Sequence, residues 1–304
     1  MIAVLCPGQG AQTPGMLTPW LEIDEVAATL GALSEATKVD LLAHGTTSDA
    51  DTIRDTAIAQ PLLVASAIAT GRAVLGDATP GIVAGHSVGE LGAAALAGVV
   101  TDAEAVRLVT VRGDAMAAAA AASEPTSMAA VLGGVEAEVL ERLEALGLTP
   151  ANMNGGGQIV AAGSKAGIEA LIADAPARAR VIELQVAGAF HTAYMEPAIA
   201  ALEAAASAIS PAAPTATLLS NADGEVVTDG ADALTRIVRQ VASPVRWDLC
   251  QARMLDLGVT GIIEVAPGGV LTGLAKRSLK GIPAVALKSP DDLDAAKALL
   301  EEHA

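Results

Sequence analysis

The sequence contains very few aromatic residues. It has two tryptophans, one tyrosine and one phenylalanine among 304 residues, although 52% of the residues are hydrophobic. The core must therefore be packed almost entirely with alanine, valine, leucine and isoleucine. Each aromatic side chain is rare enough to be considered as a candidate site residue, and Phe190 is the only phenylalanine.

Positive charge is also scarce. The chain has 18 Lys and Arg residues against 35 Asp and Glu residues, which gives a formal net charge of −17 at pH 7. A phosphate backbone would repel such a chain, so we expect no nucleic-acid partner, although a local basic patch is still allowed. The two cysteines, Cys6 and Cys250, argue against a disulfide scaffold and indicate a reduced, cytoplasmic location.

Long hydrophobic runs are absent as well. No run of 18 apolar residues is free of polar interruption, so we expect no transmembrane helix and no membrane partner. Residues 1–5 lack the basic region of a signal peptide. The length allows one large domain with a smaller inserted domain, and we expect a monomer.

Short apolar runs alternate with longer helical patterns, which predicts an α/β fold. Residues 2–5 and 82–84 are predicted to be buried strands, and residues 89–97 a helix. Thr101 and Glu104 form a capping box, which predicts the start of a second helix that runs to about residue 122.

The pattern changes after residues 123–126. The following order of elements is βαββαβ, which predicts a ferredoxin-like unit. Its predicted elements are residues 128–132, 136–146, 151–154, 158–162, 165–173 and 181–186. We therefore expect a ferredoxin-like domain at 126–187, inserted into an α/β-hydrolase-like catalytic domain formed by 1–125 and 188–304. The three glycines at 155–157 join two strands, which favours a hairpin turn over a phosphate loop.

The segment Gly85-His86-Ser87-Val88-Gly89 matches the pattern G-x-S-x-G. A predicted strand precedes it and a predicted helix follows, which is the setting of a nucleophile elbow. The sharp turn needs both glycines and leaves the serine exposed above the sheet. An ordinary glycine-rich turn would explain the pattern alone, but not its setting. Ser87 is the predicted nucleophile.

A serine nucleophile needs a base, and the chain has only four histidines. His303 is at the C-terminus, and His44 lies in a polar stretch that predicts a surface loop. His86 directly precedes Ser87, so its side chain should point elsewhere. His191 follows a predicted strand and is the remaining candidate for the base.

Eight short motifs are found in order along the chain: PGQGAQ at 7–12, QP at 60–61, GHSVGE at 85–90, RG at 112–113, NMN at 152–154, GAFHT at 188–192, PVRW at 244–247 and PGGVLTGL at 267–274. Together they resemble the malonyl-CoA:acyl-carrier-protein transacylases over essentially the whole chain. The resemblance implies a cytoplasmic acyltransferase of fatty-acid synthesis, or of polyketide synthesis. Its partners are malonyl-CoA and acyl carrier protein; the coenzyme A thioester is a substrate, and no cofactor or metal is implied.

The resemblance assigns the reaction steps to individual residues. Ser87 is acylated, and His191 removes its proton. The backbone N–H groups of Gln9 and Val88 form the oxyanion hole. The family lacks a triad carboxylate, and the backbone carbonyl at the position of Gln240 orients the histidine instead.

Arg112 matches the arginine that binds the malonyl carboxylate, and Gln60 and Asn154 match other substrate-binding positions. Arg107 and Arg112 are five residues apart on one predicted helix, so they point about 140° apart and do not share a solvated face. Two ordinary surface arginines are the alternative. A guanidinium is the appropriate partner for a terminal carboxylate, and acetyl groups would leave it unpaired.

Two details favour malonyl over methylmalonyl. Val88 follows the nucleophile where methylmalonyl-selecting relatives often have glutamine. Ala189-Phe190 precedes His191 as in malonyl-type domains, and Phe190 would narrow the pocket beside C2 of the acyl group. The alternative is that Phe190 only packs in the core.

Two rival functions remain open on the sequence. A serine esterase would need a carboxylate partner, for which Asp223 is the best candidate, although Asp223-Gly224 also predicts a hairpin turn. A non-catalytic docking subunit should have a damaged elbow or histidine, and neither is damaged here.

An acidic carrier protein needs a local basic patch on this acidic chain. One candidate is Lys276, Arg277 and Lys280; the other, which the sequence slightly favours, is Arg178 and Arg180 on the inserted unit.

Overall fold

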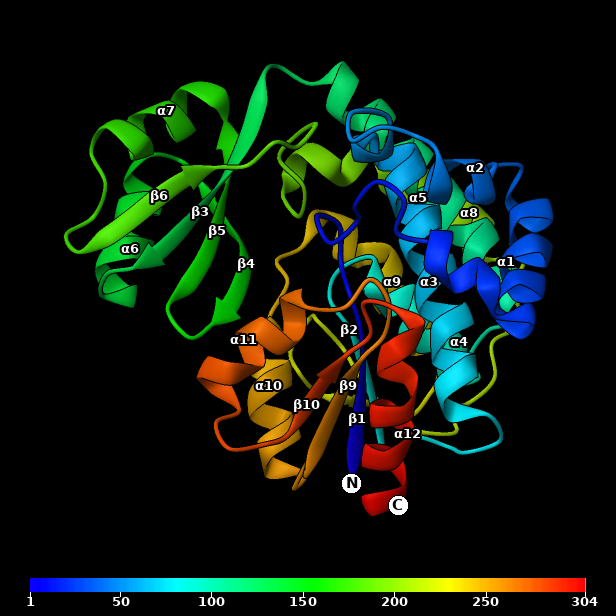
Figure 1. Cartoon of the computed structure of the whole chain (residues 1–304). Helices are drawn as coiled ribbons and strands as arrows, with labels where there is room; N and C mark the ends of the chain where they lie inside the picture. The colour runs from blue at the N-terminus through cyan, green and yellow to red at the C-terminus, as the bar shows by residue number, and fades with distance from the viewer. Residues whose placement is uncertain (304) are drawn as a thin grey trace.

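The computed structural model describes residues 1–303 and contains two separate β-sheets (Figure 1). The larger sheet has six strands, all parallel to their neighbours except the last. In spatial order the strands are β10 (Ala284–Ala286), β9 (Gly261–Glu264), β1 (Ile2–Cys6), β2 (Ile82–Gly85), β7 (Thr217–Leu219) and β8 (Val226–Val227).

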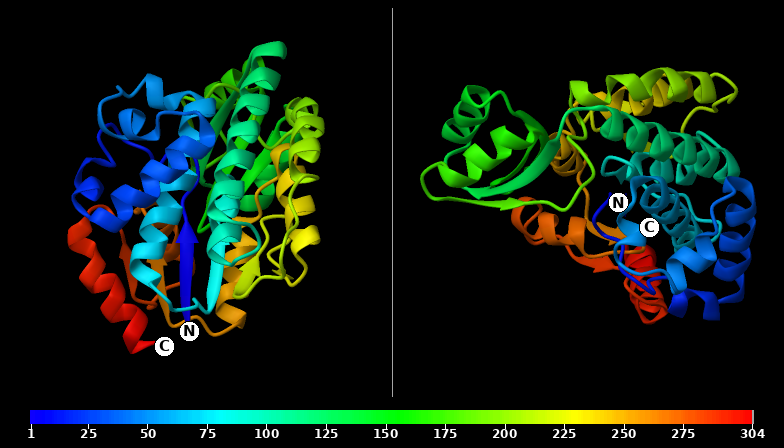
Figure 2. Two further views of the ribbon diagram at one scale, coloured as in Figure 1. Left: turned by 90° about the vertical axis from the view of Figure 1, so that its right-hand side faces the viewer. Right: turned by 90° about the horizontal axis from the view of Figure 1, so that it is seen from above.

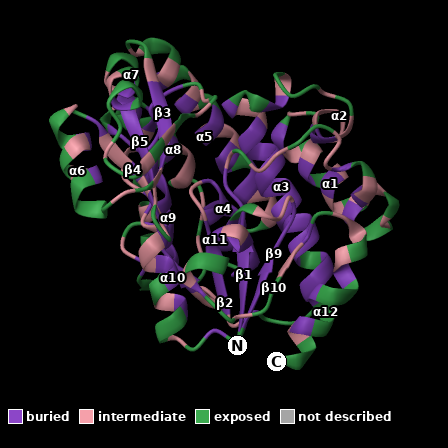
Figure 3. Cartoon of the chain, turned by 60° about the vertical axis from the view of Figure 1, so that its left-hand side comes forward, coloured by how far each residue is buried: buried purple, intermediate pink, exposed green. Residues whose placement is uncertain are grey.

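Helices cover both faces of this sheet because its central strand is apolar on both sides. Along β1, Val4 and Cys6 belong to one core cluster, and Ala3 and Leu5 belong to another. The first cluster includes residues of α1 (Asp24–Thr37), α3 (Thr56–Leu75), α4 (Gly89–Leu96), α5 (Asp102–Ala122), α9 (Gly230–Arg239) and α12 (Leu293–Glu302). The second cluster includes α10 (Trp247–Asp256) and α11 (Val270–Ser278). Figure 3 shows the buried strands between these layers.

Helix α3 is the central core helix. It is long and apolar enough to cross a membrane, but 89% of its most apolar window is buried inside the protein. The core helix of a soluble protein passes the same test of length and composition. The expectation that this chain has no membrane-spanning helix therefore stays a prediction.

The smaller sheet is antiparallel, with the strand order β4-β5-β3-β6. Its strands are β3 (Thr126–Gly133), β4 (Thr149–Gly155), β5 (Gln158–Ser164) and β6 (Ala179–Glu183). Helices α6 (Glu136–Ala145) and α7 (Lys165–Ala173) pack on one face through an apolar cluster. The chain order βαββαβ with this strand order is the ferredoxin-like arrangement. We propose that residues 126–187 form the inserted domain, since both of its sheet edges lie within this range (Figure 2).

Backbone hydrogen bonds connect the inserted unit to the rest of the chain. In β4, Met153 N–H donates to Val245 O at 2.8 Å, and Val245 N–H donates to Ala151 O at 2.8 Å. These bonds form a parallel bridge between Asn152 and Val245. The apolar residues on this side of the small sheet, including Met128 and Val160, also pack against α5, α8 (Glu196–Ala206) and Phe190.

Two local predictions agree with the structure. The capping box at Thr101 and Glu104 is present at the start of α5. Residues 155–157 form the hairpin turn between β4 and β5, and all three glycines have positive φ, which other residues rarely adopt.

Two other local predictions were wrong. The strand expected at 181–186 ends at Glu183, because β6 pairs with β3 only as far as Ala129. His44 lies in helix α2 (Leu41–Thr46) and not in a loop, since the Asp40 side chain caps the helix by accepting from Ala43 N–H at 3.0 Å.

Candidate active site

The elbow between β2 and α4 exposes a single serine. Ser87 has φ of +54°, in the left-handed region. A Cβ atom at Gly85 would overlap the backbone of Gly89, and one at Gly89 would overlap the carbonyl of Cys6. Both glycines of the motif are therefore required by the close approach of α4 to β1 and β2.

His191 is hydrogen-bonded to this serine. Its Nε2 lies 2.8 Å from Ser87 Oγ, and its Nδ1 lies 2.9 Å from the backbone carbonyl of Gln240. A carbonyl oxygen only accepts, so Nδ1 carries the proton and Nε2 is free to accept the proton of Ser87. Burial, followed by the charge of Arg112, lowers the pKa of His191 to about 3, which keeps the ring neutral.

Arg112 is a buried cation beside the same serine. Its side chain is 1% exposed, whereas Arg107 on the same helix is exposed. One guanidinium nitrogen donates to Gln60 Oε1 at 2.8 Å, and the other reaches Ser87 Oγ at 3.3 Å and Gln240 Oε1 at 3.4 Å. Within residues 1–303, no carboxylate forms an ion pair with it. Burial lowers the pKa of Arg112 to about 10, so it remains charged at neutral pH.

Two backbone N–H groups are available next to the serine. Among the hydrogen bonds of residues 1–303, neither Gln9 N–H nor Val88 N–H donates to a protein group. Gln9 follows β1, and its side chain is held by Thr56 at 3.3 Å and by Gln60 at 3.4 Å. Val88 is the residue that caps α4, so its N–H lies at the positive end of that helix.

A cavity of about 300 Å³ opens onto these groups. It lies at the carboxyl ends of β1 and β2, where ligands bind in α/β sheets. The inserted unit and α11 supply the opposite wall. The lining residues include Gln9, Gln60, Ser87, Asn154, Phe190, His191 and Leu271. Arg112 does not line the cavity, although its guanidinium reaches Ser87 Oγ.

His86 also lines the cavity, but it is not the base that is hydrogen-bonded to Ser87. Its Nε2 is 2.8 Å from Asn154 Oδ1, and its ring packs edge-on against Trp247 with the ring centroids 5.7 Å apart. Burial lowers the pKa of His86. The side chain of His86 was expected to point away from Ser87, and its contact with Asn154 agrees with this. That contact joins the elbow to β4.

Asp223 is not placed to act as a triad carboxylate. It lies in the turn between β7 and β8 and forms an ion pair with Arg236 at 2.7 Å. The orienting group on His191 is the Gln240 carbonyl. The same turn contains Asn221, whose side chain hydrogen-bonds Ser87 N–H at 2.7 Å, a contact that the sequence analysis missed.

Glu264 is a second residue without a signal in the sequence analysis. It is fully buried at the end of β9, and its carboxylate accepts from Gly269 N–H, Leu271 N–H and Thr272 N–H, each at 2.8 Å. These bonds cap α11, which carries Leu271 into the cavity wall. A lone glutamate before a proline-glycine turn gives no periodic signal.

A doubly covered, mainly parallel sheet, a strained serine at an elbow and a neutral histidine bonded to it define a serine acyl-transfer enzyme. The chain belongs to the acyl transferase domain family, whose model matches residues 4–295. The family and the fold class predicted from the sequence are confirmed.

The chain is 54% identical over 299 residues to the malonyl CoA-acyl carrier protein transacylase of Mycobacterium tuberculosis, covering 97% of this chain and 98% of the relative. A crystal structure of a transacylase from that organism superposes with a TM-score of 0.93 at 53% identity, covering 98% and 99% of the two chains. A malonyl-transacylase in complex with a type II polyketide acyl-carrier protein superposes with a TM-score of 0.91 at 30% identity, covering 98% and 99%.

Proposed function

We propose that this chain transfers a malonyl group from malonyl-CoA to the phosphopantetheine thiol of acyl carrier protein, through an ester on Ser87. The identity to malonyl transacylases over nearly the full chain supports the reaction. One observation supports the residue assignment most strongly. Ser87 Oγ lies 2.8 Å from a neutral histidine nitrogen and 3.3 Å from a buried guanidinium that forms no ion pair with a carboxylate of residues 1–303.

The first half-reaction forms the ester. His191 Nε2 accepts the Ser87 proton as Oγ attacks the thioester carbon, and the N–H groups of Gln9 and Val88 bind the oxyanion. The C–S bond then breaks, and the coenzyme A sulfur leaves with the proton held by His191. The Gln240 carbonyl stabilises the imidazolium formed between these steps.

The second half-reaction repeats these steps in reverse with a different thiol. His191 accepts the pantetheine proton, the sulfur attacks the ester carbonyl, and Ser87 Oγ leaves with that proton. Arg112 binds the malonyl carboxylate in both half-reactions. Gln60, Asn154 and Phe190 form the surrounding acyl site, and we propose that no cofactor takes part.

Mass spectrometry of the intact protein tests this assignment directly. After mixing with malonyl-CoA, the wild type should carry one malonyl group, and carrier protein should remove it. Ser87→Ala should carry none. An adduct on another residue would refute the role of Ser87, and release of malonate to water at the rate of transfer would favour a hydrolase.

The carrier protein needs a basic surface near the cavity. Lys276 and Arg277 are exposed in the last turn of α11, the helix that lines the cavity, and Arg277 packs beside the hairpin glycine Gly156. Arg178 and Arg180 are exposed at the start of the edge strand β6. The position of α11 reverses the preference drawn from the sequence, and we propose that the α11 cluster docks the carrier protein.

We place the reaction in the cytoplasm, with the chain acting as a monomer on fatty-acid carrier proteins. A role in polyketide synthesis is the alternative, because one structural relative binds a carrier protein of that kind.

A further inference from the structure

The amide of Asn221 holds the elbow from beneath. Its Oδ1 accepts from Ser87 N–H at 2.7 Å, and its Nδ2 donates to Gly85 O at 2.8 Å. The residue is completely buried and does not line the cavity. One side chain therefore fixes the backbone on both sides of His86 without itself lining the cavity.

These two hydrogen bonds extend the contact between β2 and β7 beyond the last backbone pair of the two strands. Strands β2 and β7 pair in parallel at Ile82 with Thr217 and at Val83 with Leu218. Beyond these pairs β2 turns into the elbow, and the side-chain amide of Asn221 supplies the donor and the acceptor that a backbone would have supplied. Ser87 needs such support, since left-handed backbone is disfavoured for a residue with a Cβ atom.

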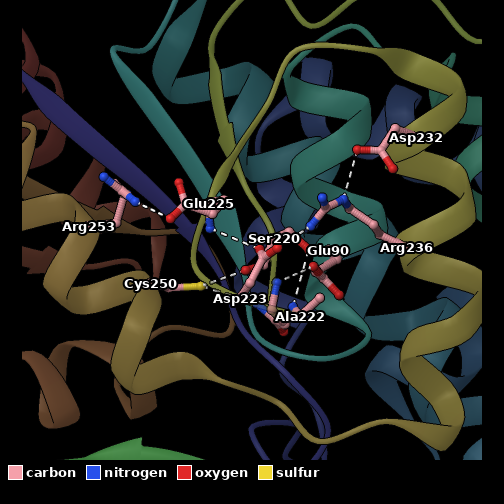
Figure 4. A network of polar contacts seen from close by, with 10 residues as sticks. Glu90, Ser220, Ala222, Asp223, Glu225, Asp232, Arg236, Cys250 and Arg253 are labelled. Carbon is pink, nitrogen blue, oxygen red and sulfur yellow. Dashed lines mark hydrogen bonds and ion pairs between the residues drawn. The ribbon is translucent and has the colours of Figure 1, made fainter.

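Glu90 in turn holds Asn221. It lies in the first turn of α4, is 4% exposed, and accepts from Asn221 N–H through Oε1 at 2.8 Å. Its Oε2 has no hydrogen-bond partner among residues 1–303. Figure 4 shows Glu90 beside the turn that carries Ser220, Ala222 and Asp223. Burial raises the pKa of Glu90 to about 8, so the carboxyl group is mostly neutral at pH 7.

We propose that Asn221, held by Glu90, is the positioning residue that keeps Ser87 Oγ in line with His191 and the acyl carbon. This inference rests on the proposed role of Ser87 as the nucleophile. Asn221 acts through the backbone, so its loss slows acylation and leaves the binding of malonyl-CoA unchanged.

The substitution Asn221→Asp tests this arrangement because it changes one atom. An ionised carboxylate has no donor for Gly85 O, whereas a protonated one regains it. Glu90 on α4 and Cys250 on α10 contact Asn221 directly, and the charged groups that act on Glu90 are Arg112 on α5, Arg236 on α9 and Asp223 in the turn.

The measured quantity is the rate of Ser87 malonylation. Samples are quenched rapidly and the mass of the intact protein is determined, for the variant and for wild type at each pH. Asn221→Asp should be slower than wild type by about 10-fold to 100-fold at pH 8. Burial of this position raises the pKa of the introduced carboxyl group above the ordinary aspartate value, so the rate of Asn221→Asp relative to wild type should rise at least about threefold by pH 5.5 as the carboxyl protonates. Asn221→Ala should also be slow, but the ratio of its acylation rate to that of wild type should not change with pH. Asp223→Asn in the same turn should acylate at the wild-type rate.

Variants of Glu90 keep the test open if Asn221→Asp does not fold. Glu90→Leu retains the side-chain size but removes the acceptor, and should lower the acylation rate about tenfold at an unchanged KM for malonyl-CoA. Glu90→Gln retains the acceptor and should stay within about twofold of wild type at pH 7.

The outcomes separate two failures. A wild type that is never malonylated refutes the proposed function, and the inference with it. A malonylated wild type refutes the inference alone if Asn221→Asp matches it at every pH, if their ratio does not change with pH, or if Glu90→Leu acylates at the wild-type rate.

Discussion

Replacing Arg112 with alanine should alter the choice of acyl group more than the chemistry. The guanidinium is 1% exposed and is held by Gln60, so a malonyl carboxylate bound beside it would be largely withdrawn from water. Arg112→Ala leaves that carboxylate buried without a counter-charge. An acetyl group carries no carboxylate and does not suffer this loss.

The size of the effect follows from the burial of this pair. Removing one partner of a buried, hydrogen-bonded ion pair costs about 2–5 kcal/mol. The expected loss in kcat/KM for malonyl-CoA is therefore about 30-fold to 5,000-fold. Arg112 also lowers the pKa of His191, so its removal changes the base for every substrate. The ratio of malonyl to acetyl rates cancels that shared effect and is the informative quantity.

The assay is acylation of Ser87 by malonyl-CoA and by acetyl-CoA under the same conditions. Arg107→Ala is the matched control, because Arg107 lies on the same helix but is exposed. Arg112→Lys should fall between wild type and Arg112→Ala, since it keeps the charge but loses the planar fork. If both acyl groups slow equally in Arg112→Ala, the arginine is structural and the carboxylate binds elsewhere.

Three further results are expected. The pKa of Glu90 is raised from 4.5 to about 8 in the folded protein, so the stability lost through its ionisation grows as pH rises between these values. The Tm of Glu90→Gln minus the Tm of wild type should therefore be roughly 3 °C or more higher at pH 8 than at pH 4.5. A Tm difference that does not change with pH would contradict this. Arg277→Glu with Lys280→Glu should raise KM for carrier protein about tenfold at low salt and leave acylation by malonyl-CoA unchanged, whereas a similar effect of Arg178→Glu alone would favour the other patch. Phe190→Ala should increase the methylmalonyl rate relative to malonyl by about tenfold, and an unchanged ratio would make Phe190 a core residue only.

The sequence predicted the parts of the site that depend on local patterns. The two glycines of the elbow have a fixed spacing around Ser87, and the strand before and helix after have clear periodicity. His191 was found by elimination, because so few histidines were available. The order βαββαβ was predicted for the same reason as the elbow: each element has its own pattern, and connections between neighbours are short.

The groups that the sequence did not predict act over long separations. Asn221 is 134 residues from Ser87, and the turn around it indicated only a hairpin. Glu90 is the last residue of the motif at 85–90, but its buried partner Asn221 lies 131 residues away. The early end of β6 depends on where its pairing with β3 stops, at Ala129, although β3 itself continues to Thr126. No pattern within residues 181–186 encodes that point.

The bridge between β4 and Val245 also bears on how this enzyme can be re-engineered. An inserted domain is usually treated as a cassette that joins its host at two points, which for the inserted domain proposed here are near residues 126 and 187. Val245 adds a further attachment, made through backbone atoms at Ala151 and Met153, besides the side-chain contact between His86 and Asn154. A domain swap that replaces 126–187 must therefore bring its own extended, hydrogen-bonding edge for Val245. Without it, the cavity wall carrying Asn154 would lose its register with the elbow.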